Sequence, residues 1–426
     1  MERFGEPDIN SVCNWVLHSA YATARDGRNV GRSTYFFSMR FLHTSDWHLG
    51  RSLHQQDLHG FQEAVLTDIL TLAERENVDV VIVAGDIFDR AVPPVESVSL
   101  FTETIRRLAE TCTVVVTSGN HDSAIRLGYG SQLFRPGIHI ATDTDSAGTG
   151  VDVRVANETV RIYPIPYLVP DHARTVLKVT DEPLERSHQA VLEAAAQRIR
   201  DDLDSLTDPP DATVVIAHAF VTGGSTSESE RDISVGGIDS VSADVFRGFN
   251  YVALGHLHGP QTVQSPDGTV IRYSGSPLRY SFSEARQSKS VTLFDIGAGG
   301  VTNIQVIDIA QPRDMAVLTG KLAELTTEPN IERYADAWVQ VIVTDDARPT
   351  DLVQTVREAF PHALSILHRP ENAATGIGGD SAAMTALTPV EISERFIESV
   401  THRDPTDAER ELLRDVYERA RSEVDA

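Results

Sequence analysis

The chain has 426 residues, of which 41% are hydrophobic, and its formal net charge at pH 7 is −25. This length allows two or three domains with a sizeable core. The acidic balance argues against a uniformly basic nucleic-acid-binding surface, although a local basic groove and a site neutralised by metal ions both remain compatible with it.

The sequence shows no pattern typical of a membrane span, a signal peptide or a cysteine-based site. No apolar run approaches the ~20 residues needed to span a bilayer, and the N-terminal segment lacks the apolar stretch of a signal peptide. Cys13 and Cys112 are the only cysteines, so neither a disulfide framework nor a thiolate zinc site is expected. We therefore expect a cytoplasmic protein.

Residues 1–38 differ from the rest of the chain, because they show scattered Arg and Gly and no periodicity. A second methionine stands at position 39, and the first predicted strand begins directly after Met39. We expect either a disordered extension or a start assigned too far upstream.

From residue 40 to about residue 120 the pattern is strand, helix, strand, helix, strand, with helices predicted at 56–76 and 95–110. This alternation is typical of parallel strands joined by crossover helices. Residues 137–168 predict short strands with a loop at 142–150, and a helix at 182–204 precedes another apolar strand.

Polar side chains follow the first three of these strands. Asp46 and His48 end the first, and in an extended backbone side chains two residues apart point the same way. Gly85-Asp86 ends the second strand, whose continuous apolar run predicts burial on both faces. Asn120 and His121 end the third.

Two later strands end in the same way, one in His218 and the other in His256 and His258, which we expect to share a face. Each residue alone has an ordinary explanation: Asp86 as a helix N-cap, Asn120 in a turn, His218 in a core, and the last pair in an exposed loop. Together they favour a dinuclear metal centre, because ligands of open α/β sheets bind outside the carboxyl ends of the strands.

The segment 222–240 is rich in Gly, Ser and Glu. It is interpreted as a solvated loop, with a mobile loop that contacts substrate as the alternative. Strands predicted at 250–254, 269–274, 290–295 and 303–308 suggest an antiparallel second sheet. The fold expected is an α/β sandwich of two sheets with the metal ligands along one edge.

Pro312-Arg313 marks a predicted boundary, and residues 314–368 predict a small α+β module. Residues 371–386 resemble a linker because they are small and glycine-bearing. Thr388–Glu391 and Thr406–Glu409 are capping boxes that each predict a helix start. Two roles are compatible with these helices: they could pack back on the domain, or they could dock on a partner.

The motifs Asp46-x-His48, Gly85-Asp86, Gly119-Asn-His121, His218 and Gly255-His-x-His258 match, in order, those of the calcineurin-like metallophosphoesterases, which this chain resembles. Within that superfamily it is similar to the SbcD family of nuclease subunits over about residues 39–426. The resemblance implies a metallophosphoesterase nuclease domain at 39–311, a capping domain at 312–370, and a helical SbcC-binding segment at 387–426.

The resemblance also implies residue roles. One metal ion would take Asp46, His48, Asp86 and His258, and the second would take Asp86, Asn120, His218 and His256. Asp86 would bridge, and both ions would be Mn²⁺. His121 would be the catalytic histidine. Asp89 stands where some relatives carry His, and it would orient either His121 or a metal-bound water.

The implied activity is a Mn²⁺-dependent double-strand 3′–5′ exonuclease and single-strand or hairpin endonuclease acting in DNA repair and recombination. Its implied partner is an SbcC-type, SMC-like ATPase, within a heterotetramer that contains a homodimer of this chain. ATP use is assigned to the partner, since no Gly-x-x-x-x-Gly-Lys-Ser/Thr loop occurs here. The alternatives are a phosphatase or small-molecule phosphodiesterase on the same fold, and an inactive scaffold.

Overall fold

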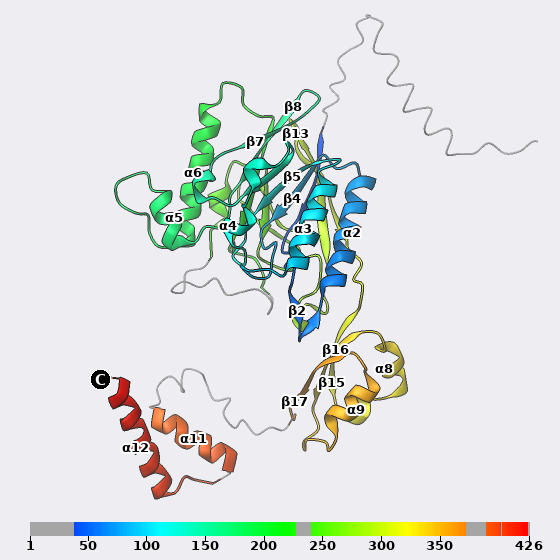
Figure 1. Cartoon of the computed structure of the whole chain (residues 1–426), viewed down its shortest axis with the longest axis vertical. Helices are drawn as coiled ribbons and strands as arrows, with labels where there is room; N and C mark the ends of the chain where they lie inside the picture. Colours follow the sequence, from blue (N-terminus) through cyan, green and yellow to red (C-terminus); the bar gives the residue numbers. More distant parts are fainter. Residues whose placement is uncertain (1–37, 227–239, 372–388, 402, 425–426) are drawn as a thin grey trace, which may run out of the picture.

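The computed structural model describes residues 38–226, 240–371, 389–401 and 403–424 (Figure 1). The expectations for the extension at 1–38, for most of the segment 222–240, for the linker at 371–386 and for Thr388 fall almost entirely outside these residues. Among the described residues, no helix combines the length and the apolar character needed to cross a membrane.

The first sheet has six strands and carries the first three ligand motifs. In order across the sheet they are β14 (Gly300–Asp308), β13 (Ser290–Gly297), β1 (Met39–Thr44), β4 (Val80–Ala84), β5 (Thr113–Thr117) and β6 (Ile138–Ala141). Strands β1, β4, β5 and β6 are parallel, whereas β13 and β14 run antiparallel to their neighbours. Every residue of β4 is buried, as its continuous apolar run predicts.

The second sheet also has six strands. They are β11 (Gln261–Val263), β12 (Val270–Tyr273), β10 (Tyr251–Gly255), β9 (Ala212–His218), β8 (Glu158–Pro164) and β7 (Val151–Val155). The four central strands are parallel, and the two edge strands are antiparallel to them.

The predicted antiparallel sheet over 250–308 is therefore wrong. Strands β10 and β12 are parallel, and β13 and β14 form a hairpin that joins the first sheet beside β1. Periodicity shows that a strand is buried but does not show which strand it pairs with. The register of β13 on β1 is supported by an ion pair between Arg40 Nε and Asp295 Oδ1, at 2.9 Å.

The two sheets pack face to face around one apolar layer. Alternate residues of each strand fill it, and Phe294 stacks on both Phe41 and Tyr251, with ring centroids 5.1 and 3.8 Å apart. Helices α2 (His59–Arg75) and α3 (Val95–Leu108) cover the outer face of the first sheet. Helices α5 (Pro170–Val176) and α6 (His188–Ser205) cover the second (Figure 1). The predicted two-sheet sandwich is confirmed.

Local boundaries differ slightly from prediction. The helix predicted at 56–76 begins at His59, because Gln56–Asp57 (β3) pair instead with Ser52–Leu53 (β2) in a short ribbon. The remaining short elements are α4 (Ala124–Leu127) and the 3-10 turns η1 (Ser131–Leu133), η2 (Thr144–Ser146), η3 (Ala243–Phe246) and η4 (Phe282–Glu284).

The small module after residue 312 contains a parallel sheet in the order β15-β16-β17. Its elements are β15 (Met315–Gly320), α7 (Leu322–Leu325), α8 (Glu328–Arg333), β16 (Trp338–Val343), α9 (Leu352–Ala359) and β17 (Ala363–His368). Val339 and Val341 face its own core, whereas Trp338 packs on Phe61 of α2, with ring centroids 4.7 Å apart. The domain boundaries themselves stay a prediction.

Two helices end the chain, α11 (Pro389–Thr401) and α12 (Asp407–Val424). The second predicted capping box is formed: the Thr406 N–H donates to Glu409 Oε2 at 2.7 Å, and the Glu409 N–H donates to Thr406 Oγ1 at 3.4 Å. Arg410 of α12 lies 3.6 Å from Glu394 of α11, so the two helices contact each other.

Trp338→Ala should lower the free energy of unfolding by about 3 kcal/mol or more, because it removes a large buried ring between the small module and α2. Urea denaturation measures the loss. Val317→Ala on the exposed side of β15 is the control and should cost well under ~1 kcal/mol. Equal losses in the two variants would contradict the packing role of Trp338.

Candidate metal centre

The carboxyl ends of five strands from both sheets meet at one edge of the sandwich. Backbone hydrogen bonds join the loops there: the His48 N–H donates to Asp86 O at 3.0 Å, and the Asp46 N–H donates to Gly85 O at 3.1 Å. The His256 N–H reaches across from the second sheet and donates to Asp46 Oδ1 at 2.9 Å. The loops that carry the predicted ligands therefore brace one another.

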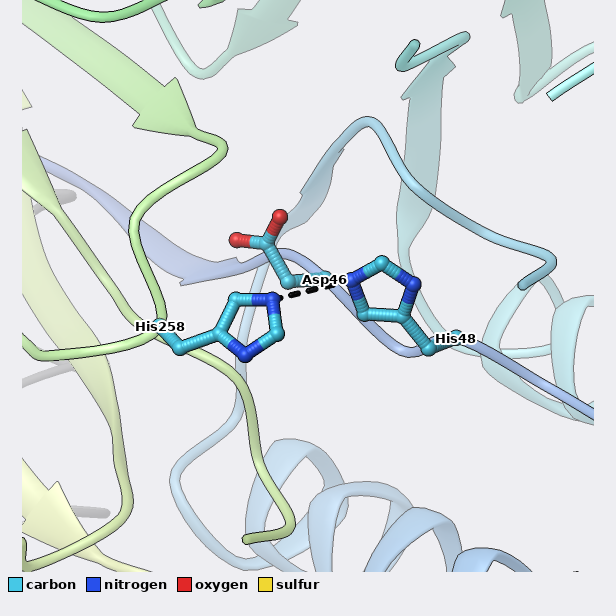
Figure 2. Close-up of side chains that lie close together, drawn as sticks. All are labelled: Asp46, His48 and His258. Atoms are coloured by element: carbon cyan, nitrogen blue, oxygen red, sulfur yellow. Dashed lines mark hydrogen bonds between the residues drawn. The ribbon is translucent and has the colours of Figure 1, made fainter. Parts of the chain in front are cut away.

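Asp46, His48 and His258 form one group, and they come from opposite sheets (Figure 2). All three are buried, and His48 Nε2 lies 3.0 Å from His258 Nε2. Two ring nitrogens come this close only with a proton or a cation between them. A divalent cation at this point would be held by both nitrogens.

His218 and Asn120 form a second group beside the first. His218 Nε2 lies 3.0 Å from Asn120 Oδ1 and 3.4 Å from Asp86 Oδ2. The ring of His256 lies close to that of His218, with centroids 5.4 Å apart. His256 joins none of the three-residue clusters found among the described residues, so the structure brings its ring near the second group without completing a cluster.

Asp86 stands between the two groups. Its Oδ2 atom is 3.4 Å from His218 Nε2, 3.6 Å from His48 Nε2 and 3.8 Å from His121 Nε2. Its Oδ1 atom accepts the backbone N–H of His121 at 2.9 Å, so it is not a helix N-cap. One carboxylate thus faces imidazoles of both groups, which is the placement that a bridging ligand needs.

Three of the histidines are held through Nδ1. His218 Nδ1 lies 3.0 Å from Ala84 O, His121 Nδ1 lies 2.8 Å from Asp89 O, and His258 Nδ1 lies 3.2 Å from Glu284 Oε1. Because each partner is an acceptor, Nδ1 carries the hydrogen, and in the neutral ring the Nε2 lone pair is left for a metal.

The backbone at four predicted ligands is strained. Asp46, His48, Asp86 and His256 have φ values of 54°, 43°, 49° and 105°, in the left-handed region that non-glycine residues rarely adopt. The predicted extended backbone is therefore wrong for both pairs of residues. Asp46 and His48 do meet, but through two left-handed residues, whereas the His256 ring lies beside His218 and the His258 ring beside His48.

Two positions beside the site, Gly255 and Gly119, have no space for a side chain. A Cβ atom on Gly255 would lie 1.8 Å from Ala84 O, and one on Gly119 would lie 2.1 Å from Asp86 Oδ1. Both contacts are far below any allowed separation. The glycines of the two motifs thus let β10 and the β5 loop approach the strand end that carries Asp86.

The charge states in the pocket suit a cation. Burial favours a raised pKa for Asp86, but His218, His48 and His121 outweigh it and hold that pKa well below the usual range. Burial lowers the pKa of His256 to about 3 and raises that of Asp46 to about 6. Burial also favours a lowered pKa for His218, but Asp86 and Asp46 outweigh it and raise that pKa to about 9, so a metal ion would displace a proton from this ring. Ionised carboxylates and neutral imidazoles are the ligating forms, and a set of oxygen and nitrogen donors without thiolates fits a divalent ion.

Two carboxylates near the site were not assigned a role by sequence reasoning. Asp122 accepts the N–H groups of Phe88 and Gly119, both at 2.9 Å, and so ties the loop after β4 to the loop after β5. Its place directly after the Gly-Asn-His motif was the available signal. Glu284, which contacts His258, lies 26 residues from it, and no pattern pointed to it.

Asp89 lies on the outer side of the histidines. Its Oδ1 atom is 3.8 Å from His48 Nδ1, 4.0 Å from His121 Nδ1 and 3.7 Å from Arg51 Nη1. Its backbone oxygen accepts from the His121 ring. The backbone of Asp89 thus holds the His121 ring, whereas the role of its side chain stays a prediction.

Comparison with known proteins identifies the class. Residues 39–260 match the family described as calcineurin-like phosphoesterase, and residues 311–401 match the type 5 capsule protein repressor C-terminal domain. The chain is also 30% identical over 331 residues to the SbcD subunit of the SbcCD nuclease of Staphylococcus epidermidis, a match that covers 77% of this chain and 85% of that protein. The protein is thus a calcineurin-like phosphoesterase, a metal-dependent hydrolase of phosphate esters. Within that class it belongs to the SbcD family.

Two solved structures are more distantly similar to this chain. TT1561 of Thermus thermophilus is 14% identical, covers 64% of this chain and 100% of its own, and has a TM-score of 0.38. A dimetal phosphatase from Danio rerio is 13% identical, covers 64% and 99%, and has a TM-score of 0.39.

Gly255→Ala should weaken metal binding at least about tenfold and destabilise the fold by about 1–3 kcal/mol, because the added methyl displaces the strand end before Asp86. Calorimetric titration with Mn²⁺ and urea denaturation measure the two effects. Gly299→Ala has no atom within 4 Å of the new methyl and is the matched control. Unchanged metal affinity in Gly255→Ala would refute the steric role of this glycine.

Proposed function

We propose that this chain is a Mn²⁺-dependent DNA nuclease whose two metal ions share Asp86. Asp46, His48 and His258 would complete the first ion's ligands, and Asn120, His218 and His256 those of the second. The observation that carries the proposal is the position of Asp86, with one oxygen within 3.6 Å of imidazoles from both groups. A pair of divalent ions supplies an activated water and charge neutralisation for in-line displacement at phosphorus.

His121 would act on the leaving group. Its Nδ1–H is anchored on Asp89 O, and its Nε2 faces the pocket 3.8 Å from Asp86 Oδ2. In the imidazolium form, Nε2 carries a proton that it can donate to the leaving oxygen or use to stabilise the charge there.

DNA is the proposed substrate, with double-strand 3′–5′ exonuclease and hairpin or single-strand endonuclease activities. The relative in Staphylococcus epidermidis is named as part of a nuclease, which supports a polymeric phosphodiester. Arg51 is one candidate contact for a DNA phosphate near the site. It lies 3.7 Å from Asp89 and stacks over Tyr280, whereas Arg126 and Arg279 donate to backbone carbonyls.

The partner proposed is an SbcC-type, SMC-like ATPase that docks on α11 and α12, with two copies of this chain in the assembly. These helices leave large apolar side chains in solvent: Phe396 is 61% exposed, Leu412 64% and Val416 57%. Apolar residues at this spacing on paired helices suit a helical partner that covers them. The burial of six of the seven predicted ligands, namely Asp46, His48, Asp86, His218, His256 and His258, argues against the inactive scaffold.

His121→Ala should bind Mn²⁺ as the unaltered protein does but cleave DNA at least about 10²-fold more slowly, since it loses the proton donor and no ligand. Asp46→Ala should lose both cleavage and part of the metal binding. Cleavage of blunt and hairpin duplexes with Mn²⁺, Mg²⁺ and Zn²⁺ measures activity, and exposed His172→Ala is the control.

Retained cleavage in both site variants would overturn the site assignment. Faster hydrolysis of nitrophenyl phosphate monoesters than of DNA ends would favour the phosphatase alternative instead.

Removal of residues 387–426 should abolish binding to the ATPase while sparing hydrolysis of a simple phosphodiester. The double variant Phe396→Glu, Leu412→Glu should do the same, because it places charge on the exposed apolar faces. Co-sedimentation with the purified ATPase measures binding, and Glu398→Ala on the same helix is the control. Undiminished complex formation by the double variant would refute docking at these faces.

A further inference from the structure

A buried ion pair lies directly behind His258. Glu284 ends η4, and Lys289 immediately precedes β13. Both are charged residues with essentially no solvent exposure, at 0% and 1%. Glu284 Oε2 lies 2.5 Å from Lys289 Nζ, and Glu284 Oε1 lies 3.2 Å from His258 Nδ1.

Lys289 also reaches His258 directly. Its Nζ donates to the backbone oxygen of His258 at 2.9 Å, to Ser276 Oγ at 3.0 Å and to Gln287 Oε1 at 3.0 Å. His258 is therefore held at two points, its ring through Glu284 and its backbone through Lys289. The carboxylate has further donors, namely the Tyr280 N–H and the Ser281 hydroxyl, each at 3.3 Å.

Stability does not account for this pair. Removing two charges from water costs several kcal/mol per ion, and replacing a buried ion pair by apolar residues is often neutral or stabilising. What the pair does provide is a fixed geometry around one imidazole. His218 and His121 are held by backbone carbonyls, whereas His258 is held by a carboxylate.

We propose that Glu284 and Lys289 are positioning residues for His258. Glu284 accepts the Nδ1 hydrogen and thereby fixes the tautomer that turns Nε2 toward Asp46 and His48. Lys289 neutralises Glu284 and fixes the backbone on which His258 stands. A carboxylate behind a ligating histidine also increases the basicity of the ring, and loss of such a partner typically lowers metal affinity 10–100-fold. This inference rests on the proposed metal site.

The pair supports only one of the two groups of ligands. His258 clusters with Asp46 and His48, and Asp46 also clusters with His218. The pair holds His258, whereas the side chains of His218 and Asn120 are held by Ala84 O and by each other. Loss of the pair should therefore weaken one of two Mn²⁺ equivalents and leave the other unchanged. General destabilisation of the fold would weaken both.

The test is a double-mutant cycle of Glu284→Gln, Lys289→Met and the double variant in the full chain. Each single variant leaves a charge buried without its partner and should be destabilised, whereas the double variant removes both charges and should recover stability. Mn²⁺ titration without substrate, followed by calorimetry and by the electron paramagnetic resonance signal of coupled Mn²⁺ ions, measures binding. The double variant should still bind one equivalent at least about tenfold more weakly.

Asp202→Asn is the matched control, because it breaks the 2.9 Å ion pair with Arg161 on an element that supplies none of the predicted ligands. It should lower stability and leave both Mn²⁺ affinities unchanged. A double variant that binds both equivalents within twofold of the unaltered protein would overturn the positioning role, and so would one that fails to fold. If the unaltered protein binds fewer than two equivalents, the proposed dinuclear site fails instead.

Discussion

The structure depends on the burial of one carboxylate among imidazoles. Asp86 has almost no solvent exposure, and three histidine Nε2 atoms lie within 3.8 Å of its Oδ2 atom. An ionised carboxylate in such a place is tolerable only when positive charge or hydrogen-bond donors surround it. The surrounding strand ends supply those groups, and the same arrangement serves a pair of cations.

The fold keeps these groups together because hydrogen bonds join each ligand-bearing loop to the next. Backbone donors of the first motif bind the second, Asp122 ties the second to the third, and the His256 N–H joins the second sheet to Asp46. The left-handed backbone at four predicted ligands costs of order 1–3 kcal/mol each, and it persists because the neighbouring loops leave no alternative. Rigid strands behind the loops hold the site in a geometry that isolated loops would not keep.

The sequence was sufficient for the sandwich and for the residues at its edge, because apolar runs predict buried strands and polar residues at their ends stand out. It was insufficient for the pairing of β13 with β1, which depends on contacts between residues far apart in sequence, such as Arg40 and Asp295, which are 255 positions apart. The positive φ angles of Asp46 and His256 were also beyond prediction, since no local sequence pattern indicates a left-handed backbone at these two residues. Glu284 and Lys289 gain their importance only when the fold places them behind His258.

The proposed nuclease activity requires that two divalent ions share Asp86. Anomalous diffraction from crystals grown with Mn²⁺ tests it most directly, because the anomalous signal locates the ions without reference to the protein. Two peaks about 3.5–4 Å apart, one on each side of the Asp86 carboxylate, are predicted. A single peak, or two peaks that do not flank Asp86, would contradict the claim.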